Sequence, residues 1–196
     1  MRVVGRARDA LWLAGSRLPP VDATAAWSAL PSELSRTMHA ISAETAKSAF
    51  VDTPHLVIAV DGRPLDLVLD AHRPQGDLKG LVPTLLDWLE DEGERAVVRD
   101  RVLPPIGETA VAPILMCPDD LDFFCTVVVA EVETSAEAVQ WTRLGLDMSA
   151  PDDLPRGVGT AVKWFDGLGP FTFDRGPYEE MLARFAQAAT TPSEPG

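Results

Sequence analysis

Polar and apolar residues alternate along much of the middle of the chain, which is typical of β-strands with one buried face. The run 55–60 is apolar, and Asp61-Gly62 follows it as a dipeptide that favours two-residue hairpin turns with positive φ. Leucines then alternate with aspartates over residues 65–70. This pattern predicts a β-hairpin that spans residues 55–70.

Helical spacing of apolar residues appears in two segments of the first half. The Ala-rich segment 38–50 ends before Pro54, and its composition predicts a helix. Apolar residues over 78–89 recur three and four apart, which predicts a helix that begins close to Gly80. The opposite face of that second helix would carry an acidic stripe, which is typical of a solvated face and is also a candidate binding surface: Asp87, Glu90, Asp91 and Glu94.

The second half of the chain contains further runs that predict strands, many of them rich in β-branched residues: 112–117, 126–133, 138–146 and 158–165. Gly176-Pro177 then begins a predicted helix that ends near residue 189, with proline at a position where its missing N–H costs little. The strands follow one another in hairpins instead of alternating with helices. The sequence therefore predicts an α+β fold, a mostly antiparallel sheet of about five strands with helices packed on it.

A single α+β domain is expected over residues 38–189, followed by a flexible tail over 190–196. Residues 1–37 differ from the rest, because they hold five arginines against three acids and show no sustained periodicity. Two interpretations remain open for them. They are either a loosely ordered extension, or residues that precede a true start at Met38.

The formal net charge of the chain is -13 at pH 7, and all of the acidic excess falls after residue 37. Such a charge disfavours nucleic acids and anionic membranes, which bind proteins through Lys and Arg. It also keeps a protein soluble and steers basic partners toward it. No apolar run approaches the roughly 18 residues of a membrane span. With two cysteines, Cys117 and Cys125, the chain is expected in a reducing compartment, the cytoplasm.

The most unusual segment is the predicted loop between two strands that runs from Cys117 to Cys125 and contains Asp119, Asp120 and Asp122. Its C-x7-C spacing does not match zinc sites, and it lacks the glycine and the distal glutamate of calcium loops. We therefore expect no metal, and two thiols buried at the strand ends. No dinucleotide, P-loop, nucleophile-elbow or zinc-protease motif occurs in the chain, so no cofactor is expected either.

Aromatic residues gather in the segment 164–175, which leads into the last helix. It is either a lid over one end of the core or a recognition loop, and the second interpretation makes Trp164, Phe171 and Arg175 candidate contact residues. Gly-Pro-Phe-x-Phe-Asp-Arg at 169–175, followed by Tyr178, resembles a group of small uncharacterised actinobacterial proteins over about residues 112–185. The resemblance implies no known activity. Many of those proteins carry Cys-x-Cys-Gly-x-x-Gly-Cys where this chain has only two cysteines.

These observations favour a binding protein without catalytic activity. Its most concrete form is an immunity or antitoxin-type inhibitor, whose acidic surface would bind a basic toxin. The candidate contacts are the acidic stripe, the three aspartates of the loop 117–125 and the aromatic segment. Two alternatives stay open: an enzyme with its site at the loop 117–125, and an interaction domain with no specialised surface.

Overall fold

The computed structural model describes residues 37–190. The predicted N-terminal extension and C-terminal tail lie outside the described residues, apart from Thr37 and Thr190. The fold is α+β, as predicted, with two mostly antiparallel sheets and three α-helices. The sheets have three and six strands, so the strand count exceeds the expected five. None of the helices in the described part of the chain is long and apolar enough to cross a membrane.

The smaller sheet is an antiparallel meander of three strands, β1 (Ile41–Ala46), β2 (His55–Val60) and β3 (Arg63–Pro64). The predicted turn at Asp61-Gly62 is confirmed, because both residues have positive φ, 51° and 72°. The predicted return strand over 65–70 is wrong. After the two-residue β3 the chain forms α1 (Leu65–His72), in which Leu65 and Leu69 are buried one helical turn apart.

The helix expected over residues 38–50 is also wrong, because β1 occupies its centre. Ile41 and Ala43 are buried, whereas Glu44 and Thr45 are exposed. Every residue of β1 pairs with a residue of β2, from Ile41 with Val60 to Ala46 with His55. The hydrogen bonds of that pairing outweigh the intrinsic helix preference of alanine, which is a weak local effect.

The larger sheet places consecutive strands next to one another, in the order β4-β5-β6-β7-β8, with β9 also paired to β7. The predicted strands at 112–117, 126–133 and 138–146 are confirmed, and the one predicted over 158–165 is shorter. The segment 171–174, assigned to a loop or lid by the sequence, is a strand. The strands are β4 (Val82–Pro83), β5 (Thr109–Met116), β6 (Val127–Thr134), β7 (Ala138–Asp147), β8 (Val162–Trp164) and β9 (Phe171–Asp174).

The helix predicted to begin close to Gly80 does not form. The next helix, α2 (Glu92–Arg101), begins only after the segment 78–89 has ended. Gly80 has a φ of 87° and donates its N–H to the buried carboxylate of Asp66 (2.9 Å), which holds the backbone out of helical geometry. Val82 and Pro83 then pair with the end of β5. Most apolar residues of 78–89 are buried all the same, and Leu85 and Trp88 are partly buried, because this segment passes through the core as extended chain and turns.

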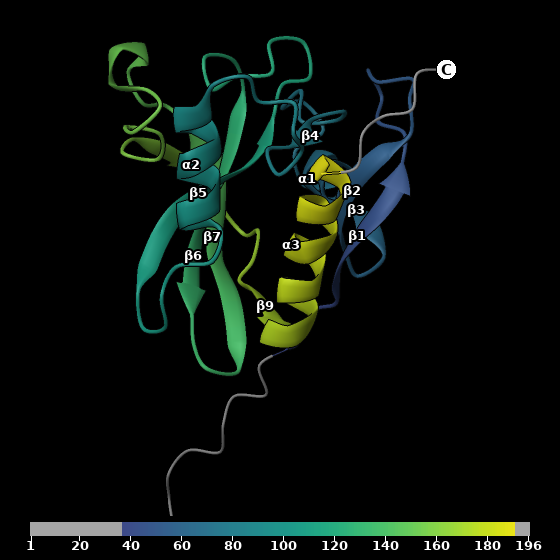
Figure 1. Ribbon diagram of the computed structural model, residues 1–196, viewed down its shortest axis with the longest axis vertical. Helices are drawn as coiled ribbons and strands as arrows, with labels where there is room; N and C mark the ends of the chain where they lie inside the picture. Colours follow the sequence, from purple (N-terminus) through teal and green to yellow (C-terminus); the bar gives the residue numbers. More distant parts are fainter. Residues whose placement is uncertain (1–36, 191–196) are drawn as a thin grey trace, which may run out of the picture. The chain divides into compact units, whose positions relative to one another are not determined.

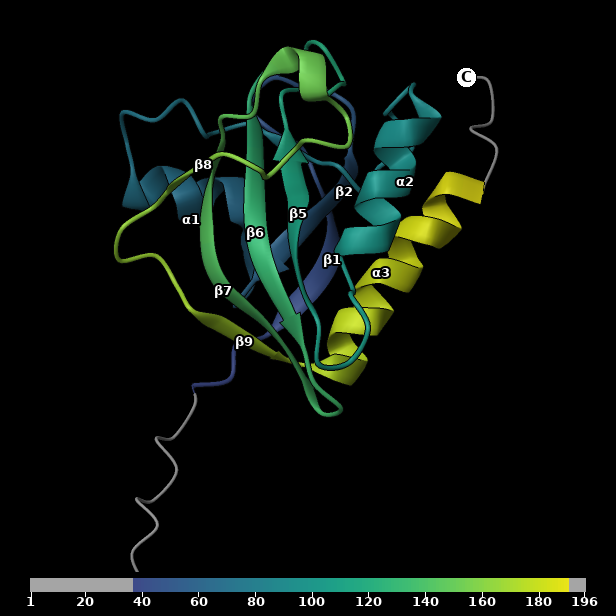
Figure 2. The ribbon, with the colours of Figure 1, turned by 90° about the vertical axis from the view of Figure 1, so that its left-hand side faces the viewer.

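The last helix, α3 (Arg175–Thr190), is confirmed, with Tyr178, Met181 and Phe185 buried along one face. Tyr178 accepts a hydrogen bond from Trp141 Nε1 (3.2 Å) and donates one to Val102 O (2.8 Å), which ties α3 to β7 and to the end of α2. α3 packs against β1, and α2 packs against β5 (Figures 1 and 2). Residues of both sheets and all three helices form a single hydrophobic core.

Candidate functional site

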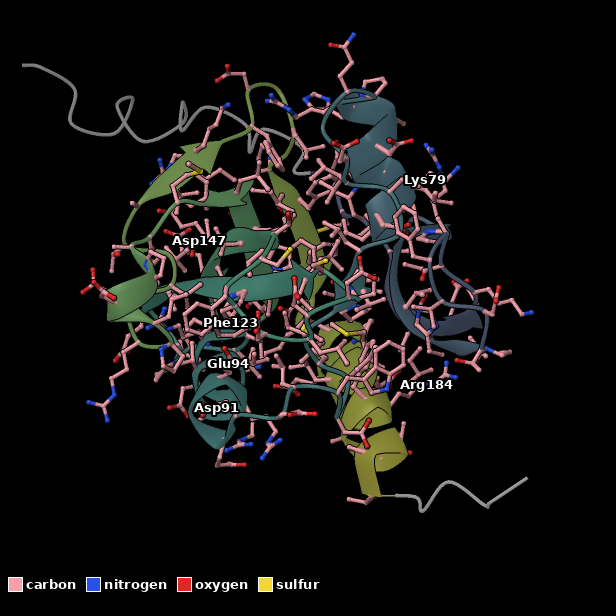
Figure 3. The ribbon with its side chains drawn as sticks, turned by 90° about the horizontal axis from the view of Figure 1, so that it is seen from above. Lys79, Asp91, Glu94, Phe123, Asp147 and Arg184 are labelled. Carbon is pink, nitrogen blue, oxygen red and sulfur yellow. The ribbon has the colours of Figure 1, made fainter. Side chains whose placement is uncertain are left out.

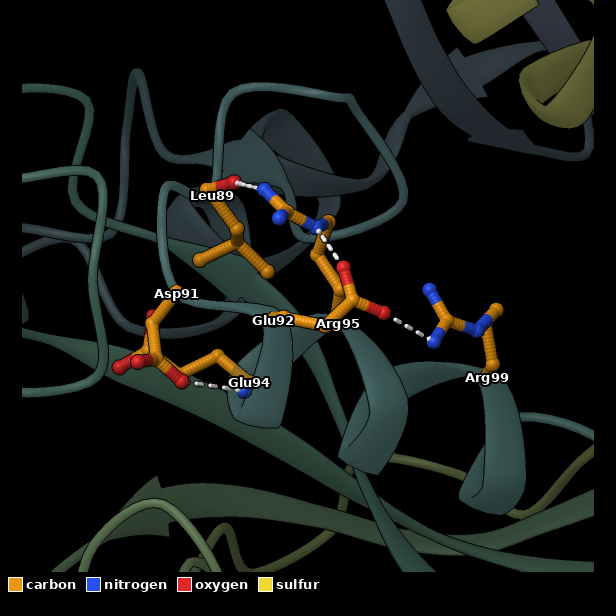
Figure 4. Close-up of polar contacts among 6 residues, drawn as sticks. All are labelled: Leu89, Asp91, Glu92, Glu94, Arg95 and Arg99. Atoms are coloured by element: carbon orange, nitrogen blue, oxygen red, sulfur yellow. Dashed lines mark hydrogen bonds and ion pairs between the residues drawn. The ribbon is translucent and has the colours of Figure 1, made fainter.

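The N-terminus of α2 carries three acidic residues, the N-cap Asp91 and, in the first turn, Glu92 and Glu94. Asp91 caps it, since its Oδ1 accepts the Glu94 N–H at 3.0 Å. Glu92 pairs with Arg95 Nε (2.8 Å) and Arg99 Nη2 (2.6 Å), and Arg95 also donates to the Leu89 carbonyl (Figure 4). These contacts lower the pKa of Glu92, chiefly through the hydrogen bond from Arg99. The helix start is therefore held by a network of local hydrogen bonds.

Glu94 is the one residue of the predicted acidic stripe that is buried, with 2% of its surface exposed. Its Oε1 accepts the backbone N–H of Phe123 at 3.0 Å, and its Oε2 has no partner. Burial raises the pKa of Glu94, and the nearby charges of Asp122 and Asp91 raise it further, against the lowering effect of the Phe123 N–H. Figure 3 shows Asp91, Glu94 and Phe123 gathered at α2.

Two acidic segments that lie far apart in the sequence therefore meet in the fold. Asp91 comes from the start of α2, and Asp122 comes from the loop between β5 and β6. The hydrogen bond from the Phe123 N–H to Glu94 joins the two segments. Phe124 lies beside Asp122, to whose Oδ1 it donates its N–H (2.8 Å), and 64% of its surface is exposed. We call Asp91, Asp122 and Phe124 the acidic corner. Within residues 37–190, no basic side chain forms an ion pair with either of its aspartates.

The predicted helical stripe of four acids is wrong, because residues 87–91 precede the helix. Asp87 lines a groove between α2 and α3, together with Arg95, Arg99 and Leu182, and so lies apart from the acidic corner. Glu90 is exposed and forms no ion pair within the described residues. Of the predicted stripe, the structure brings only Asp91 and Glu94 to the loop between β5 and β6.

The loop itself holds a second cluster, formed by Cys117, Asp120 and Cys125. One potential ligand atom from each of the three residues lies within 4.8 Å of the other two. Cys117 is half-buried and Cys125 is exposed, so the expectation of two buried thiols is wrong. Desolvation raises the pKa of the Cys125 thiol to about 11, and its side-chain hydrogen bonds with Cys117 and Asp120 act in the same direction. Asp119 is exposed and lies outside this group.

The aromatic segment contributes to the core more than to the surface. Phe171 is 9% exposed and sits in β9, where it pairs with Trp141 of β7. Trp164 is half-buried, and the Arg143 guanidinium lies 4.1 Å from the centre of its indole ring. Arg175 pairs with Glu179 one turn further along α3 (2.7 Å). The three residues proposed as contacts are thus held mainly by intramolecular packing and pairing.

Sequence reasoning missed two features of this region, the exposure of Phe124 and the grouping of Asp120 with both cysteines. The exposure of Phe124 could have been expected from the sequence, because no strand places both rings of an aromatic pair in the core when the pair lies in an acidic loop. The second depends on how the loop folds back on itself. Comparison of the chain with protein-family models, with curated proteins and with solved structures finds no match.

Proposed function

We propose that this protein is a non-catalytic binding domain whose acidic corner docks onto a basic protein, in the manner of an immunity or antitoxin-type inhibitor. The observation that carries the proposal is the meeting of Asp91 and Asp122 beside the exposed ring of Phe124. Aromatic residues supply much of the energy at protein interfaces, and surrounding charges steer the encounter. The partner is a protein with exposed Lys and Arg. A nucleic acid would be repelled by the same carboxylates.

The charge of the acidic corner is available to a partner. Asp91 and Asp122 each accept a backbone N–H with one carboxylate oxygen, but no cation within the described chain neutralises either carboxylate. The chain as a whole carries a net charge of -13, which extends the attraction for a basic surface over longer distances. A half-buried and an exposed thiol in the adjoining loop suit a reducing compartment, so we place the protein in the cytoplasm.

Catalysis at the same loop is the alternative function. The observation in its favour is Glu94, a carboxyl with a raised pKa and an unpartnered oxygen, which is what a general acid requires. That oxygen is buried, however, and a substrate has no access to it in this conformation. The burial of Glu94 therefore supports a structural role, in which it anchors the loop to α2.

The test removes the charges and the aromatic ring of the acidic corner and keeps the hydrogen bonds that its side chains accept from backbone N–H groups. In the triple variant Asp91→Asn/Asp122→Asn/Phe124→Ala, asparagine keeps the side-chain oxygen that accepts the backbone N–H. Wild-type protein immobilised as bait should recover a basic protein from the native cells. The purified partner should then bind the triple variant about 30-fold or more weakly in calorimetry, which corresponds to the loss of a ~2 kcal/mol interface centre. If the partner is a toxin, coexpression of the wild type should restore growth.

A matched control removes the same charge elsewhere. Glu108→Gln/Glu133→Gln changes two exposed acids at the opposite end of the β5–β6 pair. The affinity of this variant for the partner should lie within about threefold of the wild-type affinity. The difference should appear in the association rate, as expected for charges outside an interface. Equal losses in the control and the triple variant would show that net charge, and not the acidic corner, determines binding. Recovery of no basic protein would contradict the proposal outright.

A further inference from the structure

The loop between β5 and β6 brings two thiols and a carboxylate to one point. Cys117 directly follows β5, and its N–H donates to Thr126 O at 2.9 Å, which closes the hairpin next to Cys125. Asp120 projects from the loop between them. With one ligand atom from each residue, the three atoms lie within 4.8 Å of one another. Both cysteines are free thiols.

These distances match the dimensions of a transition-metal site. Zinc binds thiolate sulfur at about 2.3 Å and carboxylate oxygen at about 2.0–2.2 Å, so two of its ligand atoms in a tetrahedral site lie about 3.6–3.8 Å apart. The three atoms lie within 4.8 Å of one another, so side-chain movements of up to about 1 Å would bring all of them into the coordination sphere of one ion. We propose that Cys117, Asp120 and Cys125 form a binding site for a zinc-class divalent cation, with a fourth coordination position that faces solvent.

The chemistry of the ligands selects the class of ion. Two thiolates favour zinc and its softer relatives over calcium and magnesium, which take oxygen ligands. Three protein ligands and an open position are the arrangement of zinc sites that bind a water or another small ligand. Cys125 and Asp120 are both exposed, which leaves that fourth position accessible. On binding, two metal–sulfur bonds form, and the two S–H protons pass to the solvent.

Electrostatics around the cluster favour a cation. Asp119 and Asp122 flank Asp120 in the same loop, so the potential there is negative. A bound dication would compensate the charges of both thiolates and the carboxylate together.

The proposal is tested by metal titration of the full chain, kept reduced with a phosphine so that a disulfide cannot form. Co²⁺ serves as the probe, because tetrahedral thiolate ligation of Co²⁺ produces a near-ultraviolet charge-transfer band. We expect one Co²⁺ per chain with that band, and displacement of Co²⁺ by Zn²⁺. Cys117→Ser and Cys125→Ser should abolish the band. Asp120→Asn should weaken Zn²⁺ binding by about 10-fold or more.

Asp119→Asn is the matched control, because it removes one charge from the neighbouring position and leaves the three ligands in place. It should bind Co²⁺ and Zn²⁺ within about threefold of wild type. Circular dichroism of each variant verifies its fold, and the exposed position of Cys125 makes Cys125→Ser the safest of the cysteine variants. The assignment is overturned if wild type shows no charge-transfer band, or if Asp120→Asn binds Zn²⁺ as tightly as Asp119→Asn.

Discussion

Glu94 is the residue whose ionisation the fold opposes most clearly at the acidic corner. Its pKa is raised above the ordinary 4.5, first by burial and then by two neighbouring carboxylates. A group with a raised folded-state pKa stabilises the fold while it is protonated, at pH below its unfolded pKa. That contribution disappears as the pH rises through the raised folded-state value.

Glu94→Gln keeps an oxygen that can accept the Phe123 N–H and removes the ionisation. We expect the free energy of unfolding of the variant, relative to wild type, to increase as the pH rises from about 4 toward neutrality, because only the wild type must ionise a buried group. Urea unfolding across that pH range measures the difference. The same change at the exposed Glu90 is the matched control. A flat profile for Glu94→Gln would show that the carboxyl ionises as readily in the fold as in water.

The pairing of β7 with β8 depends on close backbone approach at Gly145. A Cβ at this position would lie 2.6 Å from Val162 Cγ1, 2.7 Å from Lys163 O and 2.9 Å from Trp164 Cα. Two of those three atoms are backbone, so the space cannot be recovered by a side-chain rotation. The pairing of β7 with β8, from which the chain continues into the 165–170 turn, therefore requires glycine at position 145.

Gly145→Ala should lower the free energy of unfolding by about 1–3 kcal/mol, the usual cost of forcing extra atoms into a packed interior. Gly176→Ala in the first turn of α3 is the control, since a Cβ there meets no atom within 4 Å. This second change should stabilise the protein by about 0.4–1 kcal/mol, because alanine restricts the unfolded chain. Chemical denaturation of both variants provides the comparison. Similar effects of the two substitutions would contradict the close approach of β7 and β8.

For the whole molecule, the net charge of -13 means that folding brings like charges together. Salt screens that repulsion, and the screening length falls from about 30 Å at 10 mM to about 8 Å at 150 mM ionic strength. We expect the free energy of unfolding to rise as NaCl is increased over this range. Urea titrations at fixed pH measure the rise, and Glu108→Gln/Glu133→Gln should show a smaller one. Stability that fell with added NaCl would indicate that attractive ion pairs outweigh the repulsion.

Local patterns accounted for a definite part of this fold. The strand β2, the turn at Asp61-Gly62 and the helix α3 follow from short-range signals: an apolar run, a dipeptide that tolerates positive φ, and proline and glycine at a helix start. The three central strands of the larger sheet follow from β-branched content. In each case, neighbouring residues along the chain supply the information, so no knowledge of distant partners is needed.

Where the prediction failed, a distant partner decided the outcome. The Ala-rich segment around Ala43 became a strand because β2 offered it a complete set of backbone hydrogen bonds. The leucines of 78–89 have helical spacing, yet the backbone is diverted at Gly80 by the carboxylate of Asp66 and at Val82 by pairing with β5. Burial of an apolar residue is compatible with either backbone form, so spacing alone could not distinguish them.

The candidate site shows the same division. The sequence by itself determined that the chain is acidic, that its acids concentrate near residues 87–94 and 119–122, and that two cysteines bound the second group. Only the tertiary structure decided that Glu94 is buried against Phe123, that Phe124 is exposed, and that Asp120 lies with both thiols. Composition is a property of the chain. A site, by contrast, depends on contacts between residues that the chain keeps apart until the sheets and helices pack.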